Sequence, residues 1–388
     1  MGDGPLADLH VIDLTRMLAG PYVTMLLADL GADVVKVEPP TGDPMRAVGP
    51  FRADDTTRAF GGYFQSINRN KRSVVIDLKQ PRGRAQLREL AAEADVLVEN
   101  FRPGVMERLG VGYELLSKRN PRLVYAAVRG FGDPRTGASP WSDRPAVDIS
   151  IQALAGLAGI TGPGPGFPLK TGPGVADLFP AALCAVGVLA ACHEATRSGR
   201  GQFVDVAMYD AVLSLCERIV YQHSYTGEVP GPQGNSHPIF CPFDIYACAD
   251  GHIAICASDD VQWKALCDVL GLTSLADDER YKSAEARRAN TAGVRAIIES
   301  WTRRRSGAEI TELLGGHLPV GRVQSIEEIF ADPHMRAREM LVDVDQPGSA
   351  RPVTIAGIPI KLSRTPGSIR RRAPLLGEHT AEVIKGDP

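Results

Sequence analysis

The sequence has few features that mark metal, dinucleotide or P-loop proteins. Its 388 residues include seven cysteines and eight histidines, but they form no CxxC pair and no HxxxH motif. Metal-binding side chains usually occur at such short spacings, so we predict no metal site. No GxGxxG follows a predicted strand, and GxxxxGK[ST] is absent. A dinucleotide fingerprint and a P-loop are therefore not supported.

Strong net charge and long uninterrupted apolar runs are also missing. The formal net charge is −3, so we expect no nucleic-acid partner, and local basic groups must hold any phosphorylated ligand. Glycine, proline or charge interrupts the apolar stretches, which predicts no membrane span. The first residues lack the basic and apolar regions of a signal peptide. Because the cysteine count is odd and most cysteines lie in apolar segments, we expect reduced thiols and a cytoplasmic protein.

Strands and helices alternate in the first half of the chain. Apolar patterning predicts strands near residues 9–14, 33–37, 72–78, 95–98 and 123–128, with helices near residues 21–30, 81–93 and 105–109. Units of strand, helix and strand build parallel sheets with right-handed crossovers. The fold class predicted is therefore α/β, with a Rossmann-like open parallel sheet in a large domain.

The second half contains a change of composition. We predict a loop at residues 161–174, an apolar helix over 178–192, a strand at 203–206, a helix over 208–221, a hairpin turning at 249–251, helices over 261–270 and 283–303, and a strand within 357–367. A Gly- and Pro-rich linker near residues 227–234 separates two domains. The predicted domains are a large α/β domain at 1–225, a small α+β domain at 226–325, and a C-terminal return to the large domain at 326–388.

A single acid, Asp177, precedes the apolar run of residues 178–192. Aspartate is a good helix N-cap, because its side-chain oxygen accepts from free backbone N–H groups. The positive end of the helix dipole also lowers the pKa of such a carboxylate, and an ionised aspartate in a pocket is a nucleophile. The stretch by itself leaves capping and catalysis open.

Ligands of open α/β sheets bind at the carboxyl ends of the strands. Basic residues flank several of these predicted ends: Arg46, Lys71, Arg72, Arg102, Arg108 and Arg129. Each could be a solvated surface charge, but together they suggest a rim for a phosphorylated ligand.

Several long motifs resemble the class III CoA-transferases, the family of the formyl-CoA and carnitine CoA-transferases. They are LAGPYVTMLLADLGADVVKVEPPTGDPMR, NRNKRSVVIDLK, DVLVENFRPGVMERLGVGYE, NPRLVYAAVRGFG, GRGQFVDVAMYDAVL and IPIKLSRTP. The resemblance extends over nearly the whole chain. The same superfamily includes the α-methylacyl-CoA racemases.

The resemblance implies an interlocked, ring-like homodimer and a covalent CoA transfer to a small carboxylic acid. Asp177 matches the nucleophile, which passes through an aspartyl anhydride and an aspartyl-CoA thioester. CoA and acyl-CoA act as substrates, with no tightly bound cofactor. The positions that match CoA-binding residues are Met17, Leu18, Ala19, Lys71, Arg72, Asn100, Phe101, Arg108, Arg129 and Phe131. For the two phenylalanines, core packing remains the alternative. Candidate ligands of the substrate carboxylate are Arg16, Arg46 and His237.

Two departures from family patterns narrow the reaction. The racemases carry a histidine before an aspartate where this chain has Val147 and Asp148, and valine cannot transfer a proton. Residues 234–246 lack the glycine run of the formyl-CoA enzymes. We therefore predict a transferase for a small dicarboxylate, with a racemase-type epimerase or a non-catalytic CoA-binding subunit as alternatives.

Overall fold

The computed structural model describes residues 4–384 and divides the chain into two compact units. The large unit takes in the described residues of Met1–Leu157, Thr171–Ser224 and Pro333–Pro388, and the small unit takes in Ala158–Lys170 and Tyr225–Asp332. The predicted boundaries at 225 and 325 did not include residues 158–170, which belong to the small unit. The chain leaves the large unit for residues 158–170 and returns at Thr171.

A six-stranded parallel sheet forms the centre of the large unit. Its strands are β1 (His10–Asp13), β2 (Asp33–Glu38), β3 (Lys71–Val75), β4 (Val96–Glu99), β5 (Val124–Arg129) and β6 (Phe203–Ala207). The strand order is β3-β2-β1-β4-β5-β6, with every pair parallel. This is the Rossmann order, whose direction of winding reverses between β1 and β4. The α/β prediction is confirmed.

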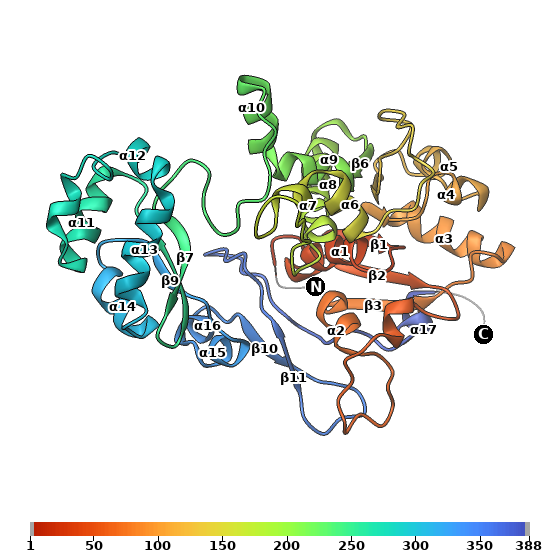
Figure 1. Ribbon diagram of the computed structural model, residues 1–388. Coiled ribbons are helices and arrows are strands. Elements are labelled where there is room, and N and C mark those ends of the chain that lie inside the picture. The colour runs from red at the N-terminus through yellow and green to blue at the C-terminus, as the bar shows by residue number, and fades with distance from the viewer. Residues whose placement is uncertain (1–3, 385–388) are drawn as a thin grey trace. The chain divides into compact units, whose positions relative to one another are not determined.

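Helices cover both faces of this sheet (Figure 1). In the large unit they are α1 (Ala19–Asp29), η1 (Pro44–Ala47), α2 (Gly62–Asn68), α3 (Pro81–Glu93), α4 (Val105–Arg108), α5 (Tyr113–Arg119), α6 (Asp148–Leu154), α8 (Val175–Ser198), α9 (Met208–Leu215), α16 (Pro333–Ala337) and α17 (Thr380–Val383). Leu87 of α3, Met106 of α4 and Leu116 of α5 pack on one face against Ile12 and Leu97. On the other face α8 packs against α1, β5 and β6. Burial on both faces explains why β4 and β5 are almost entirely apolar.

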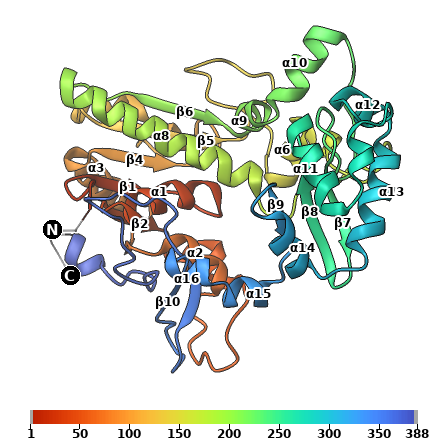
Figure 2. The ribbon, with the colours of Figure 1, turned by 90° about the vertical axis from the view of Figure 1, so that its left-hand side faces the viewer.

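Helix α8 departs from the expectation that no stretch could span a membrane. Among the helices of the described residues, only α8 is long and apolar enough to span a membrane by these two criteria. Its most apolar window has a mean hydropathy of 2.1. The helix runs alongside β5 and β6 (Figure 2) and also contacts α6 and α9. Part of its apolar surface is therefore buried in the core of the large unit, while Leu183 and Val186 are 37% and 63% exposed.

The small unit is an antiparallel sheet packed against helices. The sheet has the order β7-β8-β9, with β7 (Phe243–Cys248), β8 (Gly251–Cys256) and β9 (Val320–Arg322). The predicted hairpin is confirmed, with Ala249 and Asp250 between β7 and β8. The helices are α11 (Asp260–Leu270), η2 (Thr273–Ala276), α12 (Ala284–Ala289), α13 (Thr291–Thr302), α14 (Gly307–Leu314) and α15 (Ile326–Ala331). Their core is built around Trp263, Leu266 and Ile298.

Three predicted elements differ from the structure. The helix predicted over 208–221 is two helices, α9 and α10 (Glu217–Thr226), separated at Cys216. The helix predicted over 283–303 is divided at Asn290 into α12 and α13. No strand lies within residues 357–367; the C-terminal hairpin is instead β10 (Leu341–Val344) with β11 (Val353–Ala356). One further short helix, α7 (Leu157–Ile160), lies where the chain leaves the large unit.

Candidate active site

The loops after β1 and β4 are joined where the winding of the sheet reverses. The backbone N–H of Arg16 donates to Asn100 Oδ1 at 2.9 Å, and Asn100 Nδ2 donates to the Arg16 carbonyl at 2.8 Å. The Arg16 guanidinium lies 5.1 Å from the centre of the Phe101 ring. Asn100 therefore holds the first loop in place, and it presents Arg16 and Phe101 as a pair.

A cavity of about 370 Å³ opens beside this pair. It is lined by Leu14, Arg16, Val37, Glu38, Pro39, Ile76, Asp77, Leu78, Lys79, Phe101, Val105, Arg108 and Leu109. Apolar side chains from the ends of four strands form much of it, and three cations, Arg16, Lys79 and Arg108, stand around it. Such a lining suits a flat apolar group that carries phosphates. Phe101 also packs partly against the core, so both of its predicted roles are compatible.

A buried ion network holds Phe101 from behind. Its N–H donates to Glu99 Oε2 at 2.6 Å, and Arg129 Nε donates to its carbonyl at 3.1 Å. Arg129 is buried and forms ion pairs with both Glu99 and Asp133. The prediction that Arg129 contacts CoA does not fit this geometry, because its guanidinium is already occupied.

Phe131 is likewise a core residue. It is 7% exposed, and its ring packs edge-on against Trp141 and beside Tyr209. The geometry therefore favours the packing alternative for Phe131, whereas Phe101 faces the cavity.

Lys71 and Arg46, two further predicted contacts, are buried structural charges. Lys71 has no exposed side-chain surface, and its ammonium donates to Asp13 Oδ2, Asn68 Oδ1 and the Pro21 carbonyl at 2.8–2.9 Å. Burial lowers the pKa of Lys71 to about 8, against the raising effect of Asp13. Arg46 binds both oxygens of Glu38 and the Pro374 carbonyl. Neither side chain is placed to bind CoA or an acceptor carboxylate.

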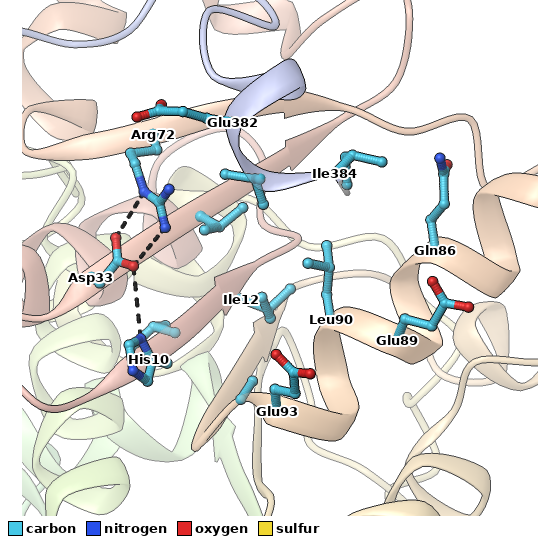
Figure 3. A pocket seen from close by; sticks show the side chains of 14 residues that line it. His10, Ile12, Asp33, Arg72, Gln86, Glu89, Leu90, Glu93, Glu382 and Ile384 are labelled. Carbon is cyan, nitrogen blue, oxygen red and sulfur yellow. Dashed lines mark hydrogen bonds and ion pairs between the residues drawn. The ribbon is translucent and has the colours of Figure 1, made fainter. Parts of the chain in front are cut away.

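Arg72 belongs to a different cavity at the opposite edge of the sheet (Figure 3). That cavity has a volume of about 560 Å³ and lies at the amino ends of β1 and β2. Arg72 Nη2 pairs with Asp33 Oδ2 at 2.5 Å, and His10 lies on the other side of the same carboxylate. Because ligands of this fold bind at the carboxyl ends, the prediction of Arg72 as a CoA contact does not fit its position.

Asp177 lies in the first turn of α8, close to the loop that bears Arg16. A Cβ placed on Gly174 would lie 3.1 Å from Leu18 Cδ2, 3.7 Å from Asp177 Oδ2 and 3.9 Å from Asp148 Cγ. Leu18 and both carboxylates therefore surround one point. Met17, next to Leu18, is 46% exposed with φ = 69°. This left-handed backbone is strained by about 1–3 kcal/mol for a residue with a Cβ, and such strain is concentrated at functional sites.

The electrostatic state of Asp177 differs from the expectation. Helix α8 begins at Val175 with Gly174 as its N-cap, so Asp177 does not cap it. Burial, followed by the negative charge of Asp148, raises the pKa of Asp177 to about 7. The predicted lowering by the helix end is therefore wrong, because desolvation and a like charge outweigh it. Near neutral pH a substantial fraction of Asp177 is ionised, with little to stabilise its charge.

Sequence reasoning missed three residues around Asp177. Asp148 accepts from the backbone N–H of Ala176 at 2.9 Å, and Gln152 donates to Asp148 at 2.8 Å. Tyr63 of α2 is near both carboxylates: burial, then Asp177, Asp43 and Asp148, raise its pKa. The spacing of four between Asp148 and Gln152, beside a Gly-rich loop, was the available signal.

A family model described as CoA-transferase family III matches residues 6–380. The chain belongs to this family. The resemblance seen in the sequence is thus confirmed, and the chain is an acyl-CoA:carboxylate CoA-transferase of class III.

Curated relatives match this CoA-transferase over almost their whole length. Succinyl-CoA:mesaconate CoA-transferase of Haloarcula hispanica is 51% identical, with 98% of this chain and 96% of that protein covered. Succinate–glutarate CoA-transferase of Agrobacterium fabrum is 39% identical, with 98% and 95% covered. The crystal structure of a CAIB/BAIF family protein from Brucella suis is 34% identical and superposes with a TM-score of 0.86 over 98% of each chain.

In the small unit of this CoA-transferase, His237 is held by its own loop. Its Nδ1 accepts from the backbone N–H groups of Ile239 and Phe240 at 3.1 and 3.2 Å, and its ring stacks on Phe240 and packs against Phe243. These contacts fix the orientation of the imidazole ring within its loop. Within residues 4–384, no cluster of three or more His, Cys, Asp or Glu side chains could hold a metal ion.

Proposed function

We propose that this CoA-transferase moves CoA from an acyl-CoA donor, such as succinyl-CoA, to a small dicarboxylic acid by covalent catalysis at Asp177. The observation that carries the proposal is the state of the Asp177 carboxylate. It is partly buried, its pKa is about 7, and it lies beside Leu18. A carboxylate that is poorly stabilised by its surroundings is a reactive nucleophile.

The proposed reaction consists of four acyl exchanges. Asp177 attacks the donor thioester carbonyl, forms a mixed anhydride and releases the CoA thiolate. The thiolate attacks the Asp177 carbonyl carbon, which gives an aspartyl-CoA thioester and the free donor acid. The acceptor carboxylate then attacks this thioester, forms a second anhydride and again releases the thiolate. Attack of the thiolate on the acceptor carbonyl yields the new acyl-CoA and regenerates the Asp177 carboxylate.

The cavity between the β1 and β4 loops is the proposed site for the nucleotide end of CoA. Its apolar wall with Phe101 can pack against the adenine, and Arg108, Lys79 and Arg16 can pair with phosphates. Met17, Leu18 and Ala19 lead from this cavity toward Asp177, so the pantetheine arm would follow their backbone. No tightly bound cofactor is needed for this chemistry.

The choice of a dicarboxylate is supported by the names of the relatives. The names of three of them include mesaconate, glutarate and D-citramalate as substrates. Val147 precedes Asp148 and offers no second proton-transfer group, which disfavours the racemase alternative. Because Arg16 is assigned to the phosphates of CoA, His237 stays as the sequence-based candidate ligand of the acceptor, and mesaconate is the first acceptor to test.

We also propose that the enzyme is a cytoplasmic homodimer, with the interlocked ring arrangement that the family resemblance implies. The large unit exposes apolar side chains that support an interface, among them Val147, Ile149 and Val186, which are 56%, 57% and 63% exposed. Light scattering coupled to size-exclusion chromatography tests the dimer. A monomer at micromolar concentration would contradict it.

The test of the function is an adduct experiment. The protein is incubated with succinyl-CoA without acceptor, digested quickly at mildly acidic pH, and analysed by mass spectrometry for a CoA or hydroxylamine-trapped adduct. We expect the adduct on the peptide that contains Asp177, and none in Asp177→Asn. Asp210→Asn is a matched control, because Asp210 is also the third residue of its helix and its pKa is also raised. An unmodified peptide with several acyl-CoA donors would overturn the covalent mechanism.

A further inference from the structure

The N-terminus of α8 is capped by a side chain from another helix. Gly174 is the N-cap residue and supplies no side chain. The backbone N–H of Ala176 instead donates to Oδ1 of Asp148, the first residue of α6, at 2.9 Å. Asp148 thus does what a capping residue normally does. Asp177, one residue further along α8, is left without that role.

Gln152 connects this cap to the loop in front of α8. The side chain is fully buried and lies one helical turn after Asp148. Its Nε2 donates to Asp148 Oδ2 at 2.8 Å, while its Oε1 accepts from the backbone N–H of Thr171 at 2.9 Å and from the Thr171 hydroxyl at 3.2 Å. Both ends of the segment over residues 171–176, which comprises the loop and the first two residues of α8, are therefore hydrogen-bonded to α6.

The hydrogen bonds between Gln152 and Thr171 join the two points of the chain that lie on either side of its passage through the small unit. The chain leaves the large unit after Leu157 and returns at Thr171. Gln152 thus lies just before the departure, and Thr171 is the first residue after the return. The hydrogen bonds between them fix the returning chain within the large unit before it reaches Asp177.

The direction of every hydrogen bond in this network is determined. Because the Thr171 backbone N–H can only donate, Gln152 must turn its oxygen toward it and its NH₂ group toward Asp148. Asp148 must then accept on both oxygens, one from Gln152 and one from Ala176. A carboxylate satisfies this requirement, whereas an asparagine would oppose its own NH₂ group to that of Gln152.

We propose that Asp148 and Gln152 are positioning residues for the nucleophile: they cap α8 and hold residues 171–176, so that the Asp177 carboxylate stays free to attack. This inference rests on the proposed function and goes beyond it. The charge of Asp148 also acts on Asp177 and, together with burial, raises its pKa. The phenol of Tyr63 lies within reach of the charges of Asp177, Asp148 and Asp43, and burial together with these charges raises the pKa of Tyr63.

The decisive experiment compares Asp148→Asn with the double variant Asp148→Asn, Gln152→Glu. In the single variant, the new amide NH₂ at position 148 faces the NH₂ group of Gln152, so the hydrogen bond between these two side chains is lost. In the double variant the new carboxylate at position 152 can accept from Thr171 and from the amide NH₂ at position 148, while the amide oxygen at position 148 accepts from Ala176. The complete hydrogen-bond pattern is restored with the charge moved by one turn. Asp210→Asn controls for the loss of one acid from a neighbouring helix.

The kinetic readouts are steady-state CoA transfer from succinyl-CoA to mesaconate, which gives kcat and KM, and the rate of adduct formation at Asp177 without acceptor. For Asp148→Asn we expect kcat to fall about 100-fold, as for a misplaced reacting group, with KM for the acyl-CoA nearly unchanged. The midpoint of its pH–rate profile should move to lower pH, because the like charge is gone. The double variant should recover most of kcat. Unchanged kcat in the single variant, a loss confined to KM, or no recovery in the double variant would each overturn the proposal.

Amide hydrogen exchange separates this proposal from the proposed function. The amides of Thr171 and Ala176 should be protected in the natural protein, exposed in Asp148→Asn and protected again in the double variant. If the natural protein forms no adduct but these amides follow this pattern, the covalent mechanism fails and the positioning network stands. Amides that exchange equally in all three proteins would refute the network itself, whatever the outcome at Asp177.

Discussion

Replacing Lys71 by methionine is expected to destabilise the large unit rather than to remove a contact with CoA. Lys71 and Asp13 have no exposed side-chain surface and pair at 2.9 Å. Burial would raise the pKa of Asp13, but Lys71, Lys36 and the Thr15 hydroxyl together lower it to about 2. Both partners are therefore charged at neutral pH. Methionine has a similar length but leaves the Asp13 carboxylate without its closest cation.

The size of the effect follows from the burial of the pair. Removing one partner of a buried ion pair typically lowers the free energy of unfolding by about 3–5 kcal/mol, because the remaining charge is uncompensated. The Pro21 carbonyl and Asn68 Oδ1 also lose a donor. With a urea m-value of about 3 kcal/mol/M, the unfolding midpoint of the large unit should fall by roughly 1–1.7 M.

The assay is urea unfolding followed by circular dichroism, combined with calorimetric titration of CoA at low urea. Lys79→Met is the matched control, because Lys79 is an exposed lysine that lines the cavity. It should change the unfolding free energy by less than about 0.5 kcal/mol and weaken CoA binding. If Lys71→Met kept its urea midpoint and lost affinity for CoA, the structural assignment of Lys71 would be refuted.

Three other outcomes are expected. The pKa of Asp177 is about 7 instead of the ordinary 3.8, so the ionised form of Asp177 destabilises the folded state. This destabilisation is fully present above pH 7 and absent below about pH 4. Asp177→Asn should therefore raise the thermal unfolding midpoint at pH 8 and change it little at pH 4, and equal shifts at both pH values would contradict the raised pKa. Arg108→Ala should raise the Kd for CoA about tenfold by removing a charge-assisted phosphate contact, measured by calorimetry, with unaltered thermal stability. Arg287 is fully buried, donates hydrogen bonds to the Cys241 and Tyr281 carbonyls, and lies 5.4 Å from the Trp263 ring centre. Arg287→Met should therefore lower the free energy of unfolding of the small unit by about 3 kcal/mol. Tryptophan fluorescence during urea unfolding measures this change.

The sequence was informative where local patterning decides the structure. Apolar strands alternating with helices predicted the parallel sheet, and Asp250 with Gly251 marked the hairpin of the small unit. The strand predicted within residues 357–367 was wrong, because an apolar pattern does not show whether a partner strand is available. The excursion of residues 158–170 into the small unit was also not predictable, since it depends on contacts far apart in the chain.

The basic residues show why the site was only partly predictable. Their positions beside predicted strand ends and the family resemblance favoured Lys71, Arg46 and Arg129 as ligand contacts. In the structure each meets a carboxylate at the end of a strand: Asp13 of β1, Glu38 of β2 and Glu99 of β4. The pairs of Lys71 and Arg129 become visible only when strands 58 and 30 residues apart in sequence lie close together, whereas Glu38 lies only eight residues before Arg46. Arg16 and Arg108, which follow β1 and end the short helix α4, do line the cavity.

The return of the C-terminal segment to the large unit has a consequence for synthesis on the ribosome. Arg46 and Gln65 are buried, and their partners include the carbonyls of Pro374 and Asp345, which lie 328 and 280 residues further along the chain. At about 5–20 residues per second, roughly 15–65 s separate the emergence of these groups. Until the C-terminal segment emerges, water must solvate the polar groups of Arg46 and Gln65. Strands β2 and β3 also lack the C-terminal residues that pack beside them in the folded protein. The small unit, by contrast, is complete once Asp332 has been synthesised. It can therefore fold before the large unit has received its C-terminal segment.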